Sequence, residues 1–192
     1  MIYIVSGTNR PQSRTLVIAK LVEKIFAEQK IPASLIDLQK LSTHQLDGTS
    51  YESSDASPIK VELEKVLQSR GLYFVCPEYN GSYPGILKYF IDHWPYPAAF
   101  DSRPVCFVGL GGRFAGVRPV EHLQQIFTYR NSFLYPQRVF LPNIWTLLSE
   151  NSSELADKKY HDMLTAQISG FHQFIQALES KKLDARSKSL GS

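Results

Sequence analysis

Short apolar runs alternate with stretches of helical periodicity along most of the chain. The runs are typical of strands, because they are brief and several are rich in β-branched residues. They cover residues 2–6, 33–37, 72–76, 104–110 and 133–141. Between and after them, apolar residues recur every three or four positions, as on one face of a helix. The helical stripes are Ile18, Leu21, Val22, Ile25, Phe26; Ile59, Leu63, Val66, Leu67; Leu87, Phe90, Ile91, Trp94; Val120, Leu123, Phe127; and Leu164, Ile168, Phe171, Ile175, Leu178.

Five strands that alternate strictly with five helices predict an α/β domain. Crossovers between parallel strands are right-handed, so the helices are expected to cover both faces of a parallel sheet. The nearly continuous apolar character of the strands fits burial on both faces. We therefore expect one domain over residues 1–180.

Two segments fall outside this pattern. Residues 42–57 are polar and turn-forming, and the sequence leaves open whether they form a functional loop or only a mobile one. Residues 181–192 are rich in Ser, Lys and Arg and are expected to form a disordered tail.

Composition and charge argue against a membrane-spanning protein and against a nucleic-acid-binding one. The chain has 192 residues, 43% of them hydrophobic and 20% charged, and its apolar runs are too short to cross a bilayer. The N-terminus carries no signal-peptide pattern, so we expect a cytoplasmic protein. A net charge of +3, with much of the basic excess in the tail, argues against a nucleic-acid surface. Both cysteines, Cys76 and Cys106, lie in predicted strands and are expected to be buried, reduced thiols.

Residues that could carry covalent or metal chemistry do not form a known pattern. The five histidines have no metal-ligand spacing, and no cysteine lies near any of them in the sequence. A nucleophile-elbow motif is absent as well. We therefore predict no metal site and assign no catalytic acid or base.

The loop after the first strand has the features of a phosphate site. It leads into a helix, and a helix N-terminus offers unpaired N–H groups and partial positive charge. Hydroxyl donors at Thr8, Ser13 and Thr15 and the guanidinium of Arg10 would add to such a site. The dinucleotide and P-loop glycine motifs are absent, which favours a monophosphate. Alternatively, Ser13 is only an N-cap and Arg10 only a surface charge.

The loop after the third strand is the most specific stretch of the chain. Residues 77–92 read PEYNGSYPGILKYFID. Here the chain resembles the NADPH-dependent FMN reductase family, a flavodoxin-like group of flavin, quinone, azo-dye and chromate reductases, whose pattern is P-E-Y-N-x-S-x-P-G-x-L-K-N-x-I-D. Tyr89 alone departs from it, where the family has Asn. The family's first loop, G-S-x-R-x-x-S-x-N, is matched with Thr8 for Ser and Thr15 for Asn, and the resemblance covers roughly residues 1–145.

The resemblance implies a fold, a cofactor and its binding residues. The fold would be a flavodoxin-like three-layer sandwich with a five-stranded parallel sheet in the order 2-1-3-4-5. The cofactor would be FMN, with its phosphate held by Thr8, Arg10, Ser13 and Thr15. Its ring would be lined by Pro77, Glu78, Tyr79 and Asn80, and by Gly111 and Gly112 of the loop after the fourth strand. Successive backbone N–H groups of residues 77–80 could bond the ring's polar atoms. Alternatively, Asn80 and Gly81 form only a turn, Tyr79 only packs, and the glycines only turn the chain.

The resemblance also implies an activity. It is an NAD(P)H-dependent FMN oxidoreductase, which passes hydride from NADPH or NADH through FMN to a quinone, azo dye, free flavin or metal oxyanion. Similar proteins are homodimers or homotetramers, and residues 90–100 could serve as core or as a subunit contact. The alternatives are a flavodoxin-type electron carrier, a non-enzymatic FMN-binding module, or a family member that has lost nicotinamide use. Arg10, Arg14 and the positive net charge favour the enzyme over a carrier with an acidic docking surface.

Overall fold

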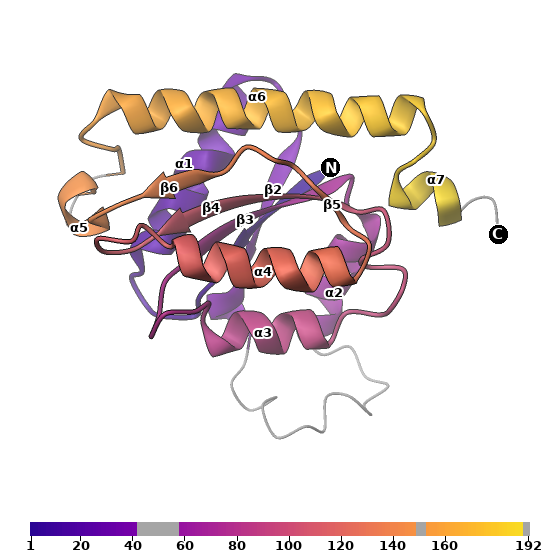
Figure 1. Cartoon of the computed structure of the whole chain (residues 1–192), viewed down its shortest axis with the longest axis horizontal. Helices are drawn as coiled ribbons and strands as arrows, with labels where there is room; N and C mark the ends of the chain where they lie inside the picture. Colours follow the sequence, from indigo (N-terminus) through magenta and orange to yellow (C-terminus); the bar gives the residue numbers. More distant parts are fainter. Residues whose placement is uncertain (42–57, 149–152, 190–192) are drawn as a thin grey trace.

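The sheet has the predicted order, and all its pairings are parallel. The structure, a computed structural model, describes residues 1–41, 58–148 and 153–189; the predicted loop at 42–57 lies outside them (Figure 1). The strands follow the order β2-β1-β3-β4-β5, and β6 also pairs with β4. Their bounds are β1 (Ile2–Ser6), β2 (Ala33–Asp37), β3 (Gly71–Pro77), β4 (Pro104–Leu110), β5 (Phe133–Leu134) and β6 (Val139–Leu141). The predicted flavodoxin-like fold class is confirmed.

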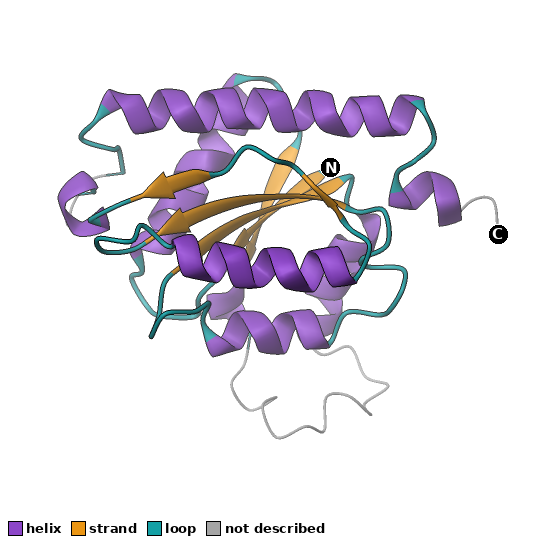
Figure 2. Cartoon of the chain, viewed as in Figure 1, coloured by secondary structure: helices purple, strands orange, loops and turns teal. Residues whose placement is uncertain are grey.

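Helices cover both faces of this sheet and bury its apolar side chains in two cores. One core includes residues of α1 (Arg14–Glu28) and α6 (Lys158–Ser180). The other includes residues of α2 (Pro58–Gln68), α3 (Gly85–Asp92) and α4 (Val117–Tyr129). Figure 2 shows the resulting three layers, with α6 above the sheet and α3 and α4 below it. No helix among the described residues is both long and apolar enough to cross a membrane.

The last predicted strand, residues 133–141, is in fact two short strands. Val105 pairs with Leu134 and Val108 pairs with Val139. An advance of three residues along β4 therefore corresponds to an advance of five residues along the segment that contains β5 and β6. Pro136 lies in the extra length and has no N–H group to donate to β4. The ladder is therefore interrupted between β5 and β6, and the chain bulges there.

A buried side chain fills the hydrogen-bonding gap that this interruption leaves. Gln167 of α6 is fully buried, and its Nε2 donates to the carbonyl oxygens of Phe107 (3.0 Å) and Gln137 (2.9 Å). The hydroxyl of Tyr73 donates to Gln167 Oε1. One amide thus ties β3, β4 and the bulge to α6.

The chain end departs from the predicted disordered tail. It contains a short helix, α7 (Ala185–Ser189), and the backbone N–H of Ala185 donates to Ser102 O at 3.1 Å. Asp184 is buried, and Arg186 pairs with Glu179 of α6. These contacts attach the segment to the domain, which the polar composition did not indicate. That residues 1–180 form one domain stays a prediction.

The aromatic side chains of residues 90–100, a segment that the sequence left between core and subunit contact, lie mainly in the core. Phe90, Trp94 and Phe100 are buried, and Trp94 and Phe100 pack against Phe127 of α4. Tyr96 is the exception, with 60% of its surface exposed. The subunit-contact alternative is therefore wrong for Phe100, because the fold itself buries that ring.

Both cysteines lie in central strands, as predicted. Cys76 is in β3 and Cys106 in β4; both are buried and unpaired. Burial raises the pKa of each thiol well above its usual value, because a thiolate would lose its hydration.

We expect Gln167→Met to lower the free energy of unfolding by about 1–3 kcal/mol, because it leaves buried carbonyl groups without a donor. Urea unfolding measures this. Gln176→Met is the matched control, since Gln176 is on the same helix but exposed. Equal stability of the two variants would contradict the role given to Gln167.

We also expect neither thiol to react with a thiol-specific reagent in the folded protein, and both to react once urea has unfolded it. Burial disfavours the reactive thiolate form and keeps the reagent away from the sulfur atom. Prompt reaction of either thiol under native conditions would show that β3 or β4 is more open than described.

Candidate functional site

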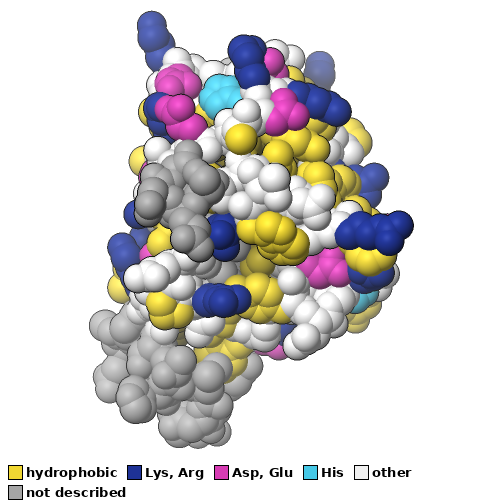
Figure 3. Space-filling model, turned by 90° about the vertical axis from the view of Figure 1, so that its left-hand side faces the viewer, with side chains coloured by type: hydrophobic (Ala, Val, Ile, Leu, Met, Phe, Trp, Pro, Cys, Tyr) yellow, Lys and Arg dark blue, Asp and Glu magenta, His cyan; other side chains and the backbone are white. Residues whose placement is uncertain are grey.

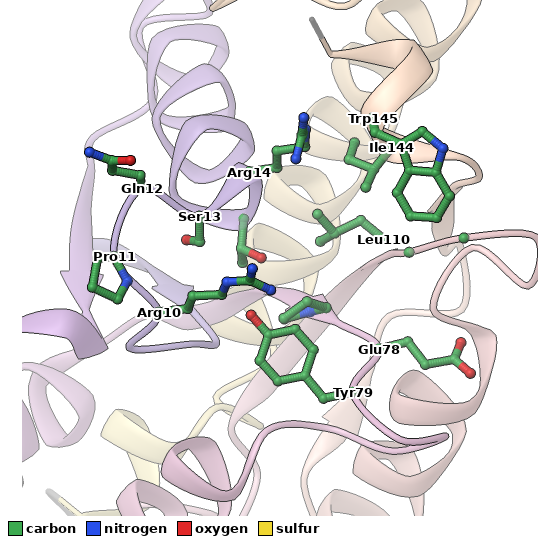
Figure 4. A pocket seen from close by; sticks show the side chains of 14 residues that line it. Arg10, Pro11, Gln12, Ser13, Arg14, Glu78, Tyr79, Leu110, Ile144 and Trp145 are labelled. Carbon is green, nitrogen blue, oxygen red and sulfur yellow. The ribbon is translucent and has the colours of Figure 1, made fainter. Parts of the chain in front are cut away.

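A pocket of about 420 Å³ lies at the carboxyl ends of the strands. In a parallel sheet these ends share one edge, and the loops there form ligand sites. The face of the molecule at this edge carries Lys and Arg side chains close to hydrophobic ones (Figure 3). The pocket (Figure 4) is lined by Arg10, Pro11, Gln12, Ser13, Arg14, Thr15, Pro77, Glu78, Tyr79, Leu110, Gly111, Gly112, Ile144 and Trp145.

One end of the pocket is formed by the start of α1. Ser13 is the N-cap, and its Oγ accepts a hydrogen bond from the N–H of Leu16 at 3.2 Å. The amides of Arg14 and Thr15, in the first turn, have no partner within the helix. They carry the positive end of the helix dipole. Ser13 is therefore an N-cap, as one interpretation held, and it also lines the pocket.

Two arginines lie at this end, and they differ in their hydrogen bonding. Arg14 Nε donates to the carbonyl oxygen of Leu148 at 3.4 Å, which ties α1 to the end of α5 (Ile144–Leu147). Arg10 makes no ion pair or side-chain hydrogen bond within the described part of the chain, and its guanidinium reaches over the pocket (Figure 4). Its donors are therefore available to an anion.

Thr8 supports the pocket from behind its wall. It is 1% exposed, accepts a hydrogen bond from the N–H of Arg10 at 3.2 Å and donates to the Tyr79 hydroxyl at 3.2 Å. This pair joins the loop after β1 to the loop after β3. Thr8 does not line the pocket, whereas the buried Thr15 does.

The loop after β3 closes as a tight hairpin. Tyr79 and Ser82 exchange backbone hydrogen bonds of 2.9 and 3.0 Å. Between them, Asn80 and Gly81 have φ angles of 51° and 77°, which a type I′ turn requires and which Asn-Gly adopts readily. Asn80 therefore belongs to the turn and does not line the main pocket. It lines an adjacent hollow of about 220 Å³, together with Phe114 and others.

The structure corrects the prediction that successive amides of this loop face the ring. The N–H of Glu78 donates to Leu110 O at 3.0 Å, and the N–H of Tyr79 is used in the hairpin. Pro77 has no N–H group. Pro77, Glu78 and Tyr79 can therefore offer a ligand only side chains and carbonyl groups, and of these four residues only Asn80 keeps an N–H group that no described backbone carbonyl accepts.

The side chain of Glu78 points away from the pocket centre and pairs with α4 (Figure 4). Its Oε1 accepts a hydrogen bond from Arg118 Nη1 at 2.7 Å. The Arg118 guanidinium also lies over the ring of Phe114, 4.0 Å from its centroid. Because Arg118 is in the first turn of α4, this ion pair fixes the loop after β3 relative to the loop after β4.

The loop after β4 needs glycine for two different reasons. Gly116 has φ +76°, and a Cβ atom there would lie 2.5 Å from the backbone N of Leu110, so the loop crosses β4 too closely for any side chain. Gly112 has no such φ, but a Cβ atom on it would lie 3.0 Å from the indole of Trp145. Both Gly111 and Gly112 line the pocket.

Tyr89, where the chain departs from the family pattern, does not line the pocket. It is part-buried on α3, packs beside the second core, and its ring lies 4.3 Å from that of His93. The departure therefore leaves the walls of the pocket unchanged.

Sequence reasoning missed the contribution of α5 to the pocket. Ile144 and Trp145 line it, and they follow β6 at the same edge of the sheet. Their position directly after the last strand was the available signal. No group of three or more His, Cys, Asp or Glu residues suited to a metal occurs in the described ranges.

Known proteins share this fold. The flavoenzyme NAD(P)H:(acceptor) oxidoreductase FerB from Paracoccus denitrificans superposes with a TM-score of 0.72 at 19% identity, over 92% of this chain and 97% of that one. The apo form of an NADH:FMN oxidoreductase superposes with a TM-score of 0.72 at 22% identity, over 88% and 87% of the two chains. At such identities the likeness establishes the flavodoxin-like fold alone.

Sequence comparison goes further. An FMN-dependent NADPH-azoreductase of Staphylococcus aureus is 31% identical over 126 residues, which is 64% of this chain and 66% of that protein. The aligned part thus spans just under two thirds of the length of this curated relative. A family model described as NADPH-dependent FMN reductase matches residues 1–146, which include every wall of the pocket. On this match, the chain belongs to the NADPH-dependent FMN reductase family.

Proposed function

We propose that the protein holds FMN in this pocket and uses it to pass two electrons, as a hydride, from NADPH or NADH to a small acceptor. The observation that carries the proposal is that the two sides of the pocket differ in chemistry. One side has the start of α1 and Arg10, whose guanidinium has no partner among the described residues, and the other has Leu110 and Trp145, with the ring of Tyr79 beside Arg10 (Figure 4). A singly phosphorylated molecule with a flat, largely apolar ring matches both ends.

The phosphate end fits a dianion. A phosphate would meet first-turn amides of α1, the hydroxyls of Ser13 and Thr15, and the guanidinium of Arg10. Thr8 would act from behind, by holding the backbone of Arg10 and the hydroxyl of Tyr79. These are the four residues proposed for the phosphate.

The ring end fits a flat molecule. Gly111 and Gly112 let a ring approach the backbone, and Tyr79 and Pro77 offer flat faces. Glu78 would act through its ion pair with Arg118, and Asn80 would lie at the rim, in the neighbouring hollow.

FMN, when bound, supplies the atom that accepts and donates hydride. The chain's part is then to bind and orient it and to keep water from one of its faces. This division of labour needs no ionisable catalytic side chain, and we assign none. The acceptor would be a quinone, azo dye, free flavin or metal oxyanion that can reach the open side of the pocket.

We further propose that the protein works in the cytoplasm as a homodimer or homotetramer. The exposed Tyr96 and Tyr129, which flank the side chain of Arg130, support a contact between subunits. Aromatic residues and arginine are enriched in such contacts.

We expect Arg10→Ala to weaken FMN binding by roughly 10- to 100-fold, the loss of one charge-assisted contact of about 1.5–3 kcal/mol. Titration with FMN, followed by quenching of flavin fluorescence, measures this. Arg138→Ala is the matched control, because Arg138 is exposed and does not line the pocket. Unchanged affinity in Arg10→Ala would reject the phosphate assignment.

Mixing the FMN-loaded protein anaerobically with NADPH or NADH in a stopped-flow instrument should bleach the visible flavin absorbance. Adding a quinone or an azo dye afterwards should restore it. If neither nicotinamide bleaches the flavin while FMN stays bound, the protein is an electron carrier or a binding module instead.

A further inference from the structure

Helix α5 is fixed to the loop after β4 by two backbone hydrogen bonds. The N–H of Asn143 donates to Gly112 O at 3.0 Å, and the N–H of Ile144 donates to Gly111 O at 2.9 Å. The side chains of Ile144 and Leu148 are buried and anchor the helix to the core. The position of Trp145, between these two anchors, is therefore set relative to the glycines.

The indole of Trp145 lies against one of these glycines and faces the pocket. The Cη2 atom would be 3.0 Å from a Cβ atom on Gly112, so a larger residue there would press on the indole and shift it. Yet Trp145 keeps 57% of its surface exposed. Figure 4 shows the ring at the end of the pocket away from Gln12 and Pro11.

An indole held in a fixed position and left half uncovered beside a pocket is suited to bind a flat apolar ligand. Its neighbours Leu110 and Ile144 are apolar as well, whereas Arg10 and the hydroxyl of Ser13 lie nearer the loop that leads into α1 (Figure 4). Contact with a flat ring would remove apolar indole surface from water and add ring–ring attraction.

We propose that Trp145 is a binding residue for the ring system of FMN and that it acts independently of the phosphate end. This inference rests on the proposed function, since it takes FMN to be the molecule in the pocket. It assigns the ring contact to a residue of α5, beyond the two loops that the sequence motifs indicate.

The two ends of the pocket can be separated with two ligands. Riboflavin has the ring of FMN but no phosphate. Trp145→Ala should therefore weaken FMN and riboflavin by the same factor, on the order of tenfold. Arg10→Ala should weaken FMN and leave riboflavin nearly unchanged. Trp145→Phe, which keeps a smaller aromatic ring, should recover part of the lost affinity for both ligands.

The experiment titrates the full-length protein, freed of flavin, with each ligand and follows the quenching of flavin fluorescence. Val61→Ala is the control for loss of an exposed apolar side chain, because Val61 is 51% exposed and does not line the pocket. Urea unfolding of each variant, compared with the unsubstituted protein, shows that the fold is intact.

Each outcome decides between the claims. Equal weakening of both ligands by Trp145→Ala, with Val61→Ala unchanged, supports the inference. Affinities in Trp145→Ala equal to those of the unsubstituted protein would overturn it, while FMN binding itself would still stand. If the unsubstituted protein binds neither flavin, the proposed function fails first.

Discussion

Parallel pairing of β1, β3 and β4 is the constraint on which the site depends. Ser6 at the end of β1 is in register with Val75 of β3, and Cys76 near the end of β3 is in register with Gly109 of β4. The loops that follow these strands therefore begin side by side, although they are far apart in the sequence. The hydrogen bond from Gly7 N–H to Val75 O (2.9 Å) carries the β1–β3 contact into the first loop.

The side chains at this edge of the sheet form two regions with different chemistry. The first turn of α1 supplies amides that have no partner within the helix, and the loop before it supplies Arg10; both suit an anion. In the loops after β3 and β4, the amides of Glu78, Tyr79 and Gly111 are used in backbone hydrogen bonds, and the pocket walls there have flat side chains or glycine. Thr8 connects the two regions through Tyr79, and the Glu78–Arg118 pair connects the second region to α4. These contacts link the walls of the pocket to one another without a ligand, and such pre-organisation lowers the ordering cost of binding.

The sequence predicted the strands and site residues that short local patterns of apolar and polar residues define. Strands at residues 2–6, 33–37 and 104–110 have the predicted bounds. The first and last of them are nearly continuous apolar runs that the fold buries, whereas residues 33–37 form a half-buried edge strand. Eight of the ten predicted site residues line the main pocket; Thr8 lies behind its wall and Asn80 lines the neighbouring hollow. Local motifs placed these residues together because each follows a parallel strand.

Two features that the sequence did not predict depend on contacts between residues far apart in the chain. The break between β5 and β6 follows from the ladder with β4 and is completed by Gln167 of α6. Likewise, Trp145 became part of the pocket only through hydrogen bonds from α5 to the glycine loop. Local features mark both regions, namely Pro136 and the position of α5 directly after β6, but the partners that define each relation lie far away in the sequence.

A crystal structure of the protein with FMN tests the central claim most directly. The account predicts the phosphate within hydrogen-bonding distance of the first-turn amides of α1 and of Arg10, and the ring against Gly112, Tyr79 and Trp145. A phosphate bound away from α1, or a ring outside the walls formed by the loops after β3 and β4, would contradict it.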